Sequence, residues 1–192
     1  MNRTHIEFLS SPRWAEMLEA DLLPWVVSVG NLGDDVLEIG PGPGLTTDLL
    51  RQRAGHVTAV EVDPGLAGQL TDRLAGTNVT VIEGDATDTG LPSNRFSAAT
   101  CFSVLHHMPT PRDQDRLFSE VRRLLRPGGV FVGVDSRDLQ PIRDGHVDDT
   151  FNPVPPDTLP RRLQAAGLAE VQIDEDEYQI RFVARKPPSG DS

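Results

Sequence analysis

Short apolar runs alternate along this chain with longer stretches in which apolar residues recur every three or four positions. Runs of the first kind have the length of buried strands, and stretches of the second kind are typical of helices with one buried side. This alternation predicts an α/β domain built on a mostly parallel sheet. The expected strands are 36–39, 57–62, 79–82, 96–102, 130–134, 169–173 and 178–184, of which the last two form an antiparallel pair.

Helices are expected in the intervals between these strands. Pro12 and Pro64 suit the first position of a helix, whereas Pro24 lies inside one and should kink or break it. Residues 137–156 show no periodicity, so we expect a long loop there, and loops of this length are usually functional or mobile. The expected helices are about 12–29, 45–53, 64–74, 113–125 and 157–166.

The length and charge of the chain limit the class of protein. Its 192 residues suffice for one domain with a complete hydrophobic core. We expect that domain to cover 1–186, with a helical segment at 1–30 and a disordered tail at 187–192. Acidic residues outnumber basic ones by 29 to 18, a formal net charge of -11. Such a charge repels phosphate backbones, so the composition predicts no nucleic-acid partner unless the surface carries a local basic patch.

Membrane and metal sites are also not expected. No apolar run approaches the roughly 18 residues that a membrane helix needs, so we expect a cytoplasmic protein without a membrane partner. The five histidines and the single cysteine, Cys101, do not follow the spacing of zinc motifs, so we expect no metal site. The sequence does not specify the oligomeric state.

The stretch VLEIGPGPG at 36–44 predicts a ligand-binding turn between a buried strand and a helix. Gly40, Gly42 and Gly44 allow a sharp turn and a close approach of the ligand to the backbone. Glu61 ends the next strand, 21 positions after Gly40, where an acidic residue of a Rossmann-like site binds the ribose hydroxyls. Together these features predict a ligand of the adenosine type.

Two details favour S-adenosylmethionine as that ligand. Only Pro43 separates the second and third glycines, whereas a dinucleotide-binding turn has two residues there. Glu38 places a carboxylate in the strand before the turn, where it would repel a pyrophosphate. The same carboxylate would attract the ammonium group of S-adenosylmethionine.

Five segments resemble, in order, the motifs of class I S-adenosylmethionine-dependent methyltransferases, specifically the methyltransferase type 11 group. They lie within about 33–135 and read VLEIGPGPG, VTAVEVDP, VIEGDATDTGLP, FSAATCFSVLHHMP and LLRPGGVFV. The resemblance implies a Rossmann-like three-layer sandwich with a seven-stranded, mostly parallel sheet in the order 3-2-1-4-5-7-6, in which strand seven is antiparallel. One position departs from the family, which often has Asp where this chain has Ser97.

The resemblance also implies roles for residues at the cofactor. Glu61 would bind the ribose, and Asp85 and Ala86 would contact the adenine. Phe102 and Ser103 end the fourth strand and would line the cofactor or substrate pocket. The full set expected at the cofactor is Glu38, Gly40, Gly42, Gly44, Glu61, Val62, Asp85, Ala86, Phe102 and Ser103.

The acceptor side is defined less sharply. His106 and His107 follow the fourth strand at the ligand-binding edge of the sheet, where one could act as a general base or merely pack. Asp135 ends the fifth strand and could orient an acceptor or cap a loop. His146 and Phe151 are candidate substrate residues if the loop at 137–156 is a lid and not a mobile surface segment.

We therefore expect an enzyme that transfers the methyl group of S-adenosylmethionine, by in-line displacement, to an oxygen, nitrogen or carbon atom of a small molecule. One alternative is a protein that binds S-adenosylmethionine without catalysis. A nicotinamide-dependent oxidoreductase is a poorer alternative, because Tyr178 and Lys186 do not form its Tyr-x-x-x-Lys pair. A nucleic-acid methyltransferase is disfavoured by the net charge of -11.

Overall fold

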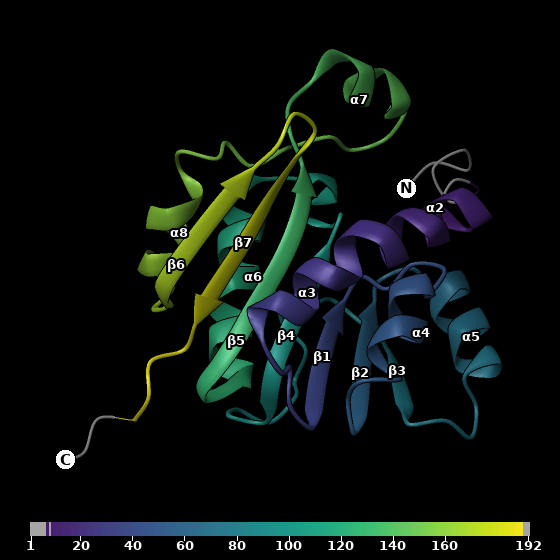
Figure 1. Ribbon diagram of the computed structural model, residues 1–192, viewed down its shortest axis with the longest axis vertical. Helices are drawn as coiled ribbons and strands as arrows, with labels where there is room; N and C mark the ends of the chain where they lie inside the picture. Colours follow the sequence, from purple (N-terminus) through teal and green to yellow (C-terminus); the bar gives the residue numbers. More distant parts are fainter. Residues whose placement is uncertain (1–6, 8, 190–192) are drawn as a thin grey trace.

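The computed structural model describes residues 7 and 9–189 of the chain (Figure 1). Residues 187–189 belong to no helix or strand. The rest of the expected disordered tail, and the first residues of the expected N-terminal segment, lie outside the described residues. The division into a domain at 1–186 and a tail therefore stays a prediction.

A seven-stranded sheet forms the middle layer, and its order β3-β2-β1-β4-β5-β7-β6 confirms the expected Rossmann-like topology. Neighbouring strands are parallel except that β7 runs antiparallel to both β5 and β6. The strands are β1 (Asp35–Ile39), β2 (His56–Glu61), β3 (Val79–Glu83), β4 (Phe96–Phe102), β5 (Leu125–Ser136), β6 (Ala169–Glu175) and β7 (Gln179–Arg185).

Helices cover both faces of the sheet, and α7 lies beyond the carboxyl ends of the strands (Figure 1). Apolar residues of α3, α4 and α5 pack against one face, and those of α6 and α8 pack against the other. The helices are α2 (Pro12–Met17), α3 (Leu23–Val29), α4 (Leu45–Leu50), α5 (Pro64–Arg73), α6 (Pro111–Leu124), α7 (Gln140–Gly145) and α8 (Leu159–Ala165).

The alternation of side chains along β1 places one carboxylate inside the protein. Leu37 and Ile39 enter the core beneath α6, whereas Val36 packs on the opposite side with α3 and α4. Glu38 therefore lies on the side of α4, where it is 1% exposed. Burial of a carboxylate at this point destabilises the folded protein unless polar or cationic groups surround the carboxylate.

The sequence predicted a kink or break at Pro24, but the N-terminal helix continues past this residue. A π-helical turn at Leu18–Leu22 joins α2 to α3, and Pro24 lies in the first turn of α3. Proline has no N–H group to donate to the preceding turn. The hydrogen-bonding pattern changes directly before Pro24, so the helix does not require this bond. The helix thus changes type where the sequence predicted a kink.

β5 begins earlier than the predicted 130–134, because Leu125 pairs with Phe96 of β4 and the next residues bond to Lys186, directly after β7. The N–H of Gly128 donates to the carbonyl of Lys186, and the N–H of Lys186 donates to the carbonyl of Gly129, both at 2.9 Å. The ammonium of Lys186 also donates to Oδ1 of Asn94 at 2.6 Å and to the carbonyl of Leu125 at 2.8 Å. These bonds fasten the end of β7 to the start of β5.

The segment at 137–156 is not wholly a loop, because it contains α7. This helix has six residues, fewer than two turns, so its sequence is too short to show a helical period. Pro141 occupies its first turn, a position that proline tolerates. The turn that follows α7 carries His146 back toward the end of β4, where the N–H of Asn152 donates to the carbonyl of His106 at 2.7 Å.

Candidate functional site

The glycine turn after β1 has the backbone that its sequence predicts. Gly40 and Gly42 have φ angles of +62° and +55°, in the left-handed region that disfavours side chains. A Cβ atom on Gly40 would also lie 2.6 Å from Cγ2 of Val104, whereas one on Gly42 would meet nothing within 4 Å. Gly40 is therefore needed for packing and conformation, and Gly42 for conformation beside open space.

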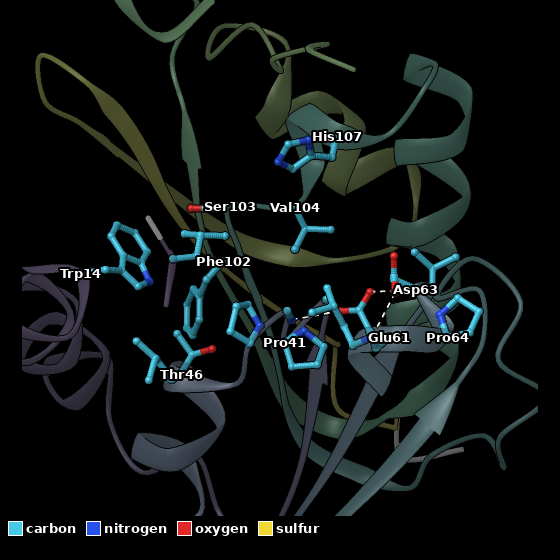
Figure 2. Close-up of a pocket in the computed structure, with 17 residues that line it drawn as sticks. Trp14, Pro41, Thr46, Glu61, Asp63, Pro64, Phe102, Ser103, Val104 and His107 are labelled. Atoms are coloured by element: carbon cyan, nitrogen blue, oxygen red, sulfur yellow. Dashed lines mark hydrogen bonds between the residues drawn. The ribbon is translucent and has the colours of Figure 1, made fainter. Parts of the chain in front are cut away.

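Glu61 holds the turn in place from the end of β2. Its Oε2 accepts from the N–H of Gly42 at 2.9 Å and its Oε1 from the N–H of Asp63 at 3.0 Å (Figure 2). Each carboxylate oxygen has a second lone pair, so both oxygens can still accept a bond from a ribose hydroxyl. The carboxylate is thus fixed by the backbone and ready for a ligand.

Glu38 lies beneath the same turn, with its Oε1 accepting from the Thr46 hydroxyl at 2.5 Å. Its Oε2 has no hydrogen-bond partner among the described residues. Burial raises the pKa of Glu38 to about 7, against the opposing effect of the hydrogen bond from the Thr46 hydroxyl. A cation placed nearby would stabilise the ionised carboxylate and lower this pKa.

A cavity of about 390 Å³ opens where β1, β2 and β4 end, with a volume in the usual range of small-molecule sites. Figure 2 shows Trp14 and Phe102 on one side of it, and Glu61 and Asp63 on the other. The lining residues are Leu9, Trp14, Gly40, Pro41, Gly42, Pro43, Leu45, Thr46, Glu61, Val62, Asp63, Pro64, Leu66, Phe102, Ser103, Val104 and His107.

The cavity brings together seven of the expected site residues, namely Gly40, Gly42, Glu61, Val62, Phe102, Ser103 and His107. Trp14 of α2 was missed, because its helical spacing is equally typical of a core residue. Thr46 was missed as well, although its place directly after the turn was an available signal.

Ser103 is the one lining residue outside the glycine turn with a left-handed backbone, at φ 58°. Its N–H donates to the carbonyl of Val134 at 2.8 Å, which ties the end of β4 to β5. Left-handed conformations of residues other than glycine are uncommon and concentrate at functional sites. Here the conformation turns the chain sharply after β4 and sends it into the 3-10 turn at Leu105–His107.

Four expected cofactor residues, Glu38, Gly44, Asp85 and Ala86, do not line the cavity. Glu38 lies behind Thr46, which lines the cavity and donates a hydrogen bond to the Glu38 carboxylate. Asp85 is exposed and its Oδ1 accepts from the N–H of Thr87 at 2.8 Å, while Ala86 packs against the core. The adenine-contacting role of Asp85 and Ala86 therefore stays a prediction.

Asp135 holds His106 in a buried pair. Its Oδ1 lies 2.5 Å from Nδ1 of His106 and also accepts from the N–H of Ser136, and its Oδ2 accepts from the N–H of Leu105 at 2.6 Å. His106 and Asp135 are each 1% exposed. Three hydrogen bonds to one carboxylate fix its position, and through it the orientation of the imidazole. Asp135 thus orients a histidine, a role that the sequence did not indicate.

Three histidine rings meet beside the cavity, although only two of them are neighbours in sequence. His107 lies 4.2 Å from His106 and 5.3 Å from His146, between ring centroids, and His106 lies 5.0 Å from His146. The ring of Phe151 packs on His146 at 4.5 Å. Sequence analysis considered the three histidines separately, whereas the structure brings their rings together. His106, His107 and His146 are called the histidine cluster below.

Residues 37–133, half of the chain, match the family described as a methyltransferase domain. The chain belongs to this family. The Pyrococcus horikoshii PH0226 protein superposes on this methyltransferase with a TM-score of 0.80 at 18% identity, and 93% of each chain is covered. NodS, an N-methyltransferase from Bradyrhizobium japonicum solved with S-adenosylhomocysteine, has a TM-score of 0.73 at 19% identity and covers 93% of this chain and 90% of its own. At such identities the likeness shows the shared fold.

The curated relatives are named as ribosomal RNA small subunit methyltransferases or as dimethyladenosine transferases. A probable ribosomal RNA small subunit methyltransferase A from Natronomonas pharaonis is 47% identical over 185 residues, which cover 85% of this chain and 66% of the relative. A dimethyladenosine transferase from Schizosaccharomyces pombe is 36% identical over 111 residues, which cover 50% of this chain and 36% of the relative. The chain thus spans about one to two thirds of the length of these relatives.

These comparisons confirm the enzyme class and the methyl donor, S-adenosylmethionine. They contradict the expectation of a small-molecule acceptor and of no nucleic-acid partner, because the curated relatives are named for RNA or adenosine. That expectation used the net charge of the whole chain, whereas contact with RNA depends on the charge of a local surface. None of the described helices is long and apolar enough to cross a membrane.

Proposed function

We propose that this methyltransferase binds S-adenosylmethionine in the cavity and transfers its methyl group to RNA in the cytoplasm. The observation that carries the proposal is the relationship to a probable ribosomal RNA methyltransferase over 85% of the chain. The proposal concerns the class of acceptor, since the relatives extend beyond the segment that this chain matches.

In the proposed complex the residues around the glycine turn would hold the donor. Glu61, whose position is fixed by Gly42 and Asp63, would accept hydrogen bonds from the ribose hydroxyls. Glu38 and Thr46 would hold the ammonium group, whose charge would stabilise the buried carboxylate. Ser103, Val104 and His107 would line the part of the cavity that receives the acceptor.

The residues that line the cavity indicate how an acceptor nucleotide would be recognised. Enzymes that modify bases extrude the nucleotide into a pocket and stack it on aromatic side chains. Trp14, Phe102 and His107 line the cavity and supply such faces. The acceptor is accordingly an unpaired or easily extruded nucleotide.

Catalysis in this site depends on alignment. The donor would supply an activated methyl group: the acceptor atom would bond to the methyl carbon as the carbon–sulfur bond breaks, S-adenosylhomocysteine would leave, and the proton of the acceptor atom would pass to solvent. Holding the two reactants in line contributes up to roughly 7–11 kcal/mol to the lowering of the barrier. Asp135 fixes His106, and His106 packs against His107 at the cavity, so we assign these residues to positioning the acceptor.

The proposal is tested with unmodified small-subunit ribosomal RNA made by transcription in vitro. The full chain and S-adenosylmethionine labelled in its methyl group should transfer label into RNA, and ribonuclease should release that label. Glu61→Ala should abolish transfer. Binding of S-adenosylhomocysteine without labelling of any transcript would overturn RNA as the acceptor while retaining the donor site, and label that survives ribonuclease would overturn it as well.

A further inference from the structure

We propose that the histidine cluster binds a divalent transition metal ion, with Zn²⁺ as the first candidate. One ring nitrogen of each histidine lies within 4.8 Å of the others. Around a tetrahedral zinc ion, with Zn–N bonds of about 2.0–2.1 Å, ligand nitrogens lie about 3.4 Å apart. The ligand nitrogens therefore need to approach one another by at most about 1.4 Å to complete the coordination, given that bond length.

The hydrogen bonds around two of the rings set the tautomer that a metal ligand needs. Nδ1 of His146 lies 2.7 Å from the carbonyl of Ile142, which can only accept, so Nδ1 carries the proton. Nδ1 of His106 faces the carboxylate of Asp135 at 2.5 Å in the same way. In each neutral ring the metal-binding lone pair is then on Nε2. Histidines that ligate metals usually show this arrangement, with the other nitrogen donating to a carboxylate or a carbonyl.

The third ring has a carboxylate beside it as well. Nδ1 of His107 lies 3.8 Å from Oδ1 of Asp149, whose side chain is 6% exposed. Asp135 and Asp149 thus place two buried carboxylates around three imidazoles, a charge that matches a divalent cation. The N–H of Asp149 donates to the carbonyl of His146 at 3.0 Å, so the carboxylate and the ligand belong to one turn.

The surrounding contacts hold the two ligand-bearing segments together. The amide of Gln114 donates to the carbonyl of Leu105 at 2.9 Å and to the carbonyl of Asn152 at 2.8 Å. Gln114 is itself buried on α6. It therefore joins the turn that carries His106 and His107 to the segment that follows His146. Preorganised ligands of this kind bind a metal without the cost of ordering a loop.

The ligand set indicates which ions the site takes. Imidazole nitrogens suit Zn²⁺ and its transition-metal neighbours, whereas Mg²⁺ and Ca²⁺ prefer oxygen ligands. Three protein ligands also leave a coordination position open, as in catalytic zinc sites. Because His107 lines the cavity, that position faces the acceptor side, where the ion would bind an oxygen or nitrogen atom of the acceptor or a water molecule.

Sequence reasoning missed this site because it searched for ligands at motif spacing. His146 follows His107 by 39 residues, and only the return of the chain after α7 brings their rings together. The alternative explanation is a purely aromatic cluster, in which Phe151 and the three rings pack as neutral side chains. Metal binding distinguishes these two explanations directly.

The experiment measures metal binding by the full chain without a purification tag. The protein is dialysed against a chelator and then titrated with Co²⁺, whose visible absorption reports four- or five-coordinate nitrogen ligation, and with Zn²⁺ in competition with a chromophoric chelator. We expect one ion per chain. His146→Gln and His107→Gln should each weaken binding more than Asp135→Asn, for which about 10–100-fold is expected.

His56→Gln is the matched control, because His56 lies at the start of β2 and bonds to Thr80, outside the cluster. It should bind Co²⁺ as the unchanged protein does. Absence of the cobalt spectrum, or equal affinities of His56→Gln and of both cluster variants, would overturn the proposal. Circular dichroism verifies folding, and two ligand variants are used so that one remains informative. No readout involves methyl transfer, so a failure of the RNA proposal is recognised separately.

Discussion

The donor side and the acceptor side of this cavity are built in different ways. The donor side comes from a short strand, a glycine turn and the end of the next strand, and its key bond joins Glu61 to Gly42, 19 positions apart. The acceptor side joins a 3-10 turn to a segment that returns after α7, and its rings come from positions 106, 107 and 146. Local sequence thus encodes the first side, whereas the path of the chain determines the second.

The largest effect should follow from removing the donor-side carboxylate. Glu61→Ala deletes the acceptor of two backbone hydrogen bonds and, in the proposed complex, of two ribose hydrogen bonds. Because hydrogen bonds to charged groups contribute about 1.5–3 kcal/mol each, affinity for S-adenosylhomocysteine should fall at least about 100-fold. Isothermal titration calorimetry measures this. Glu83→Ala is the control, since Glu83 pairs with Glu61 in the sheet but is exposed, and an equal loss there would contradict the assignment.

The second largest effect should be a dependence of the free energy of unfolding on pH, caused by Glu38 on the donor side of the cavity. Burial raises the pKa of Glu38 to about 7 from an ordinary 4.5, so the folded protein keeps a proton that the unfolded chain loses earlier. The free energy of unfolding should therefore fall by about 3 kcal/mol as the pH rises from about 4.5 to about 7. Urea denaturation across this range should show the fall in the unchanged protein and not in Glu38→Gln. Parallel curves would exclude Glu38 as its source.

A smaller difference separates two glycines of the same turn. Gly40→Ala and Gly42→Ala both place a side chain at a positive φ, which costs about 1–2 kcal/mol. Only Gly40→Ala also meets Val104, at 2.6 Å, and overpacking of this kind adds about 1–3 kcal/mol. Urea denaturation should thus find Gly40→Ala the less stable of the two. Equal stabilities would show that Val104 moves aside.

The smallest effect expected is that of an acceptor-side substitution on donor affinity. His107→Ala should leave affinity for S-adenosylhomocysteine within about twofold, because it removes no bond of the proposed donor complex. Transfer of label to RNA should nevertheless fall, since His107 lies on the acceptor side. Calorimetry and the labelling assay, run on one preparation with His56→Ala as control, measure both quantities. A large loss of donor affinity would show that the two sides are not independent.

The same contrast explains how much the sequence predicted. The strand order came from the family resemblance, and the sheet confirms it. The glycine turn came from a short local pattern, and Gly40 and Gly42 have the positive φ angles that such a turn needs. The bond between His106 and Asp135 was not predicted, because the adjacency of β4 and β5 does not show how the side chains that follow their ends are oriented. The acceptor class was wrong for a different reason, namely that a total charge does not describe a local surface.

Lys186 is the sole lysine of the chain, and it is only 7% exposed at the junction of β5 and β7. Apart from the α-amino group, an amine-reactive reagent therefore finds one target, and that target is covered in the native state. Its rate of modification would report how often this end of the sheet opens under native conditions. Modification of Lys186 can therefore measure local unfolding without an introduced probe.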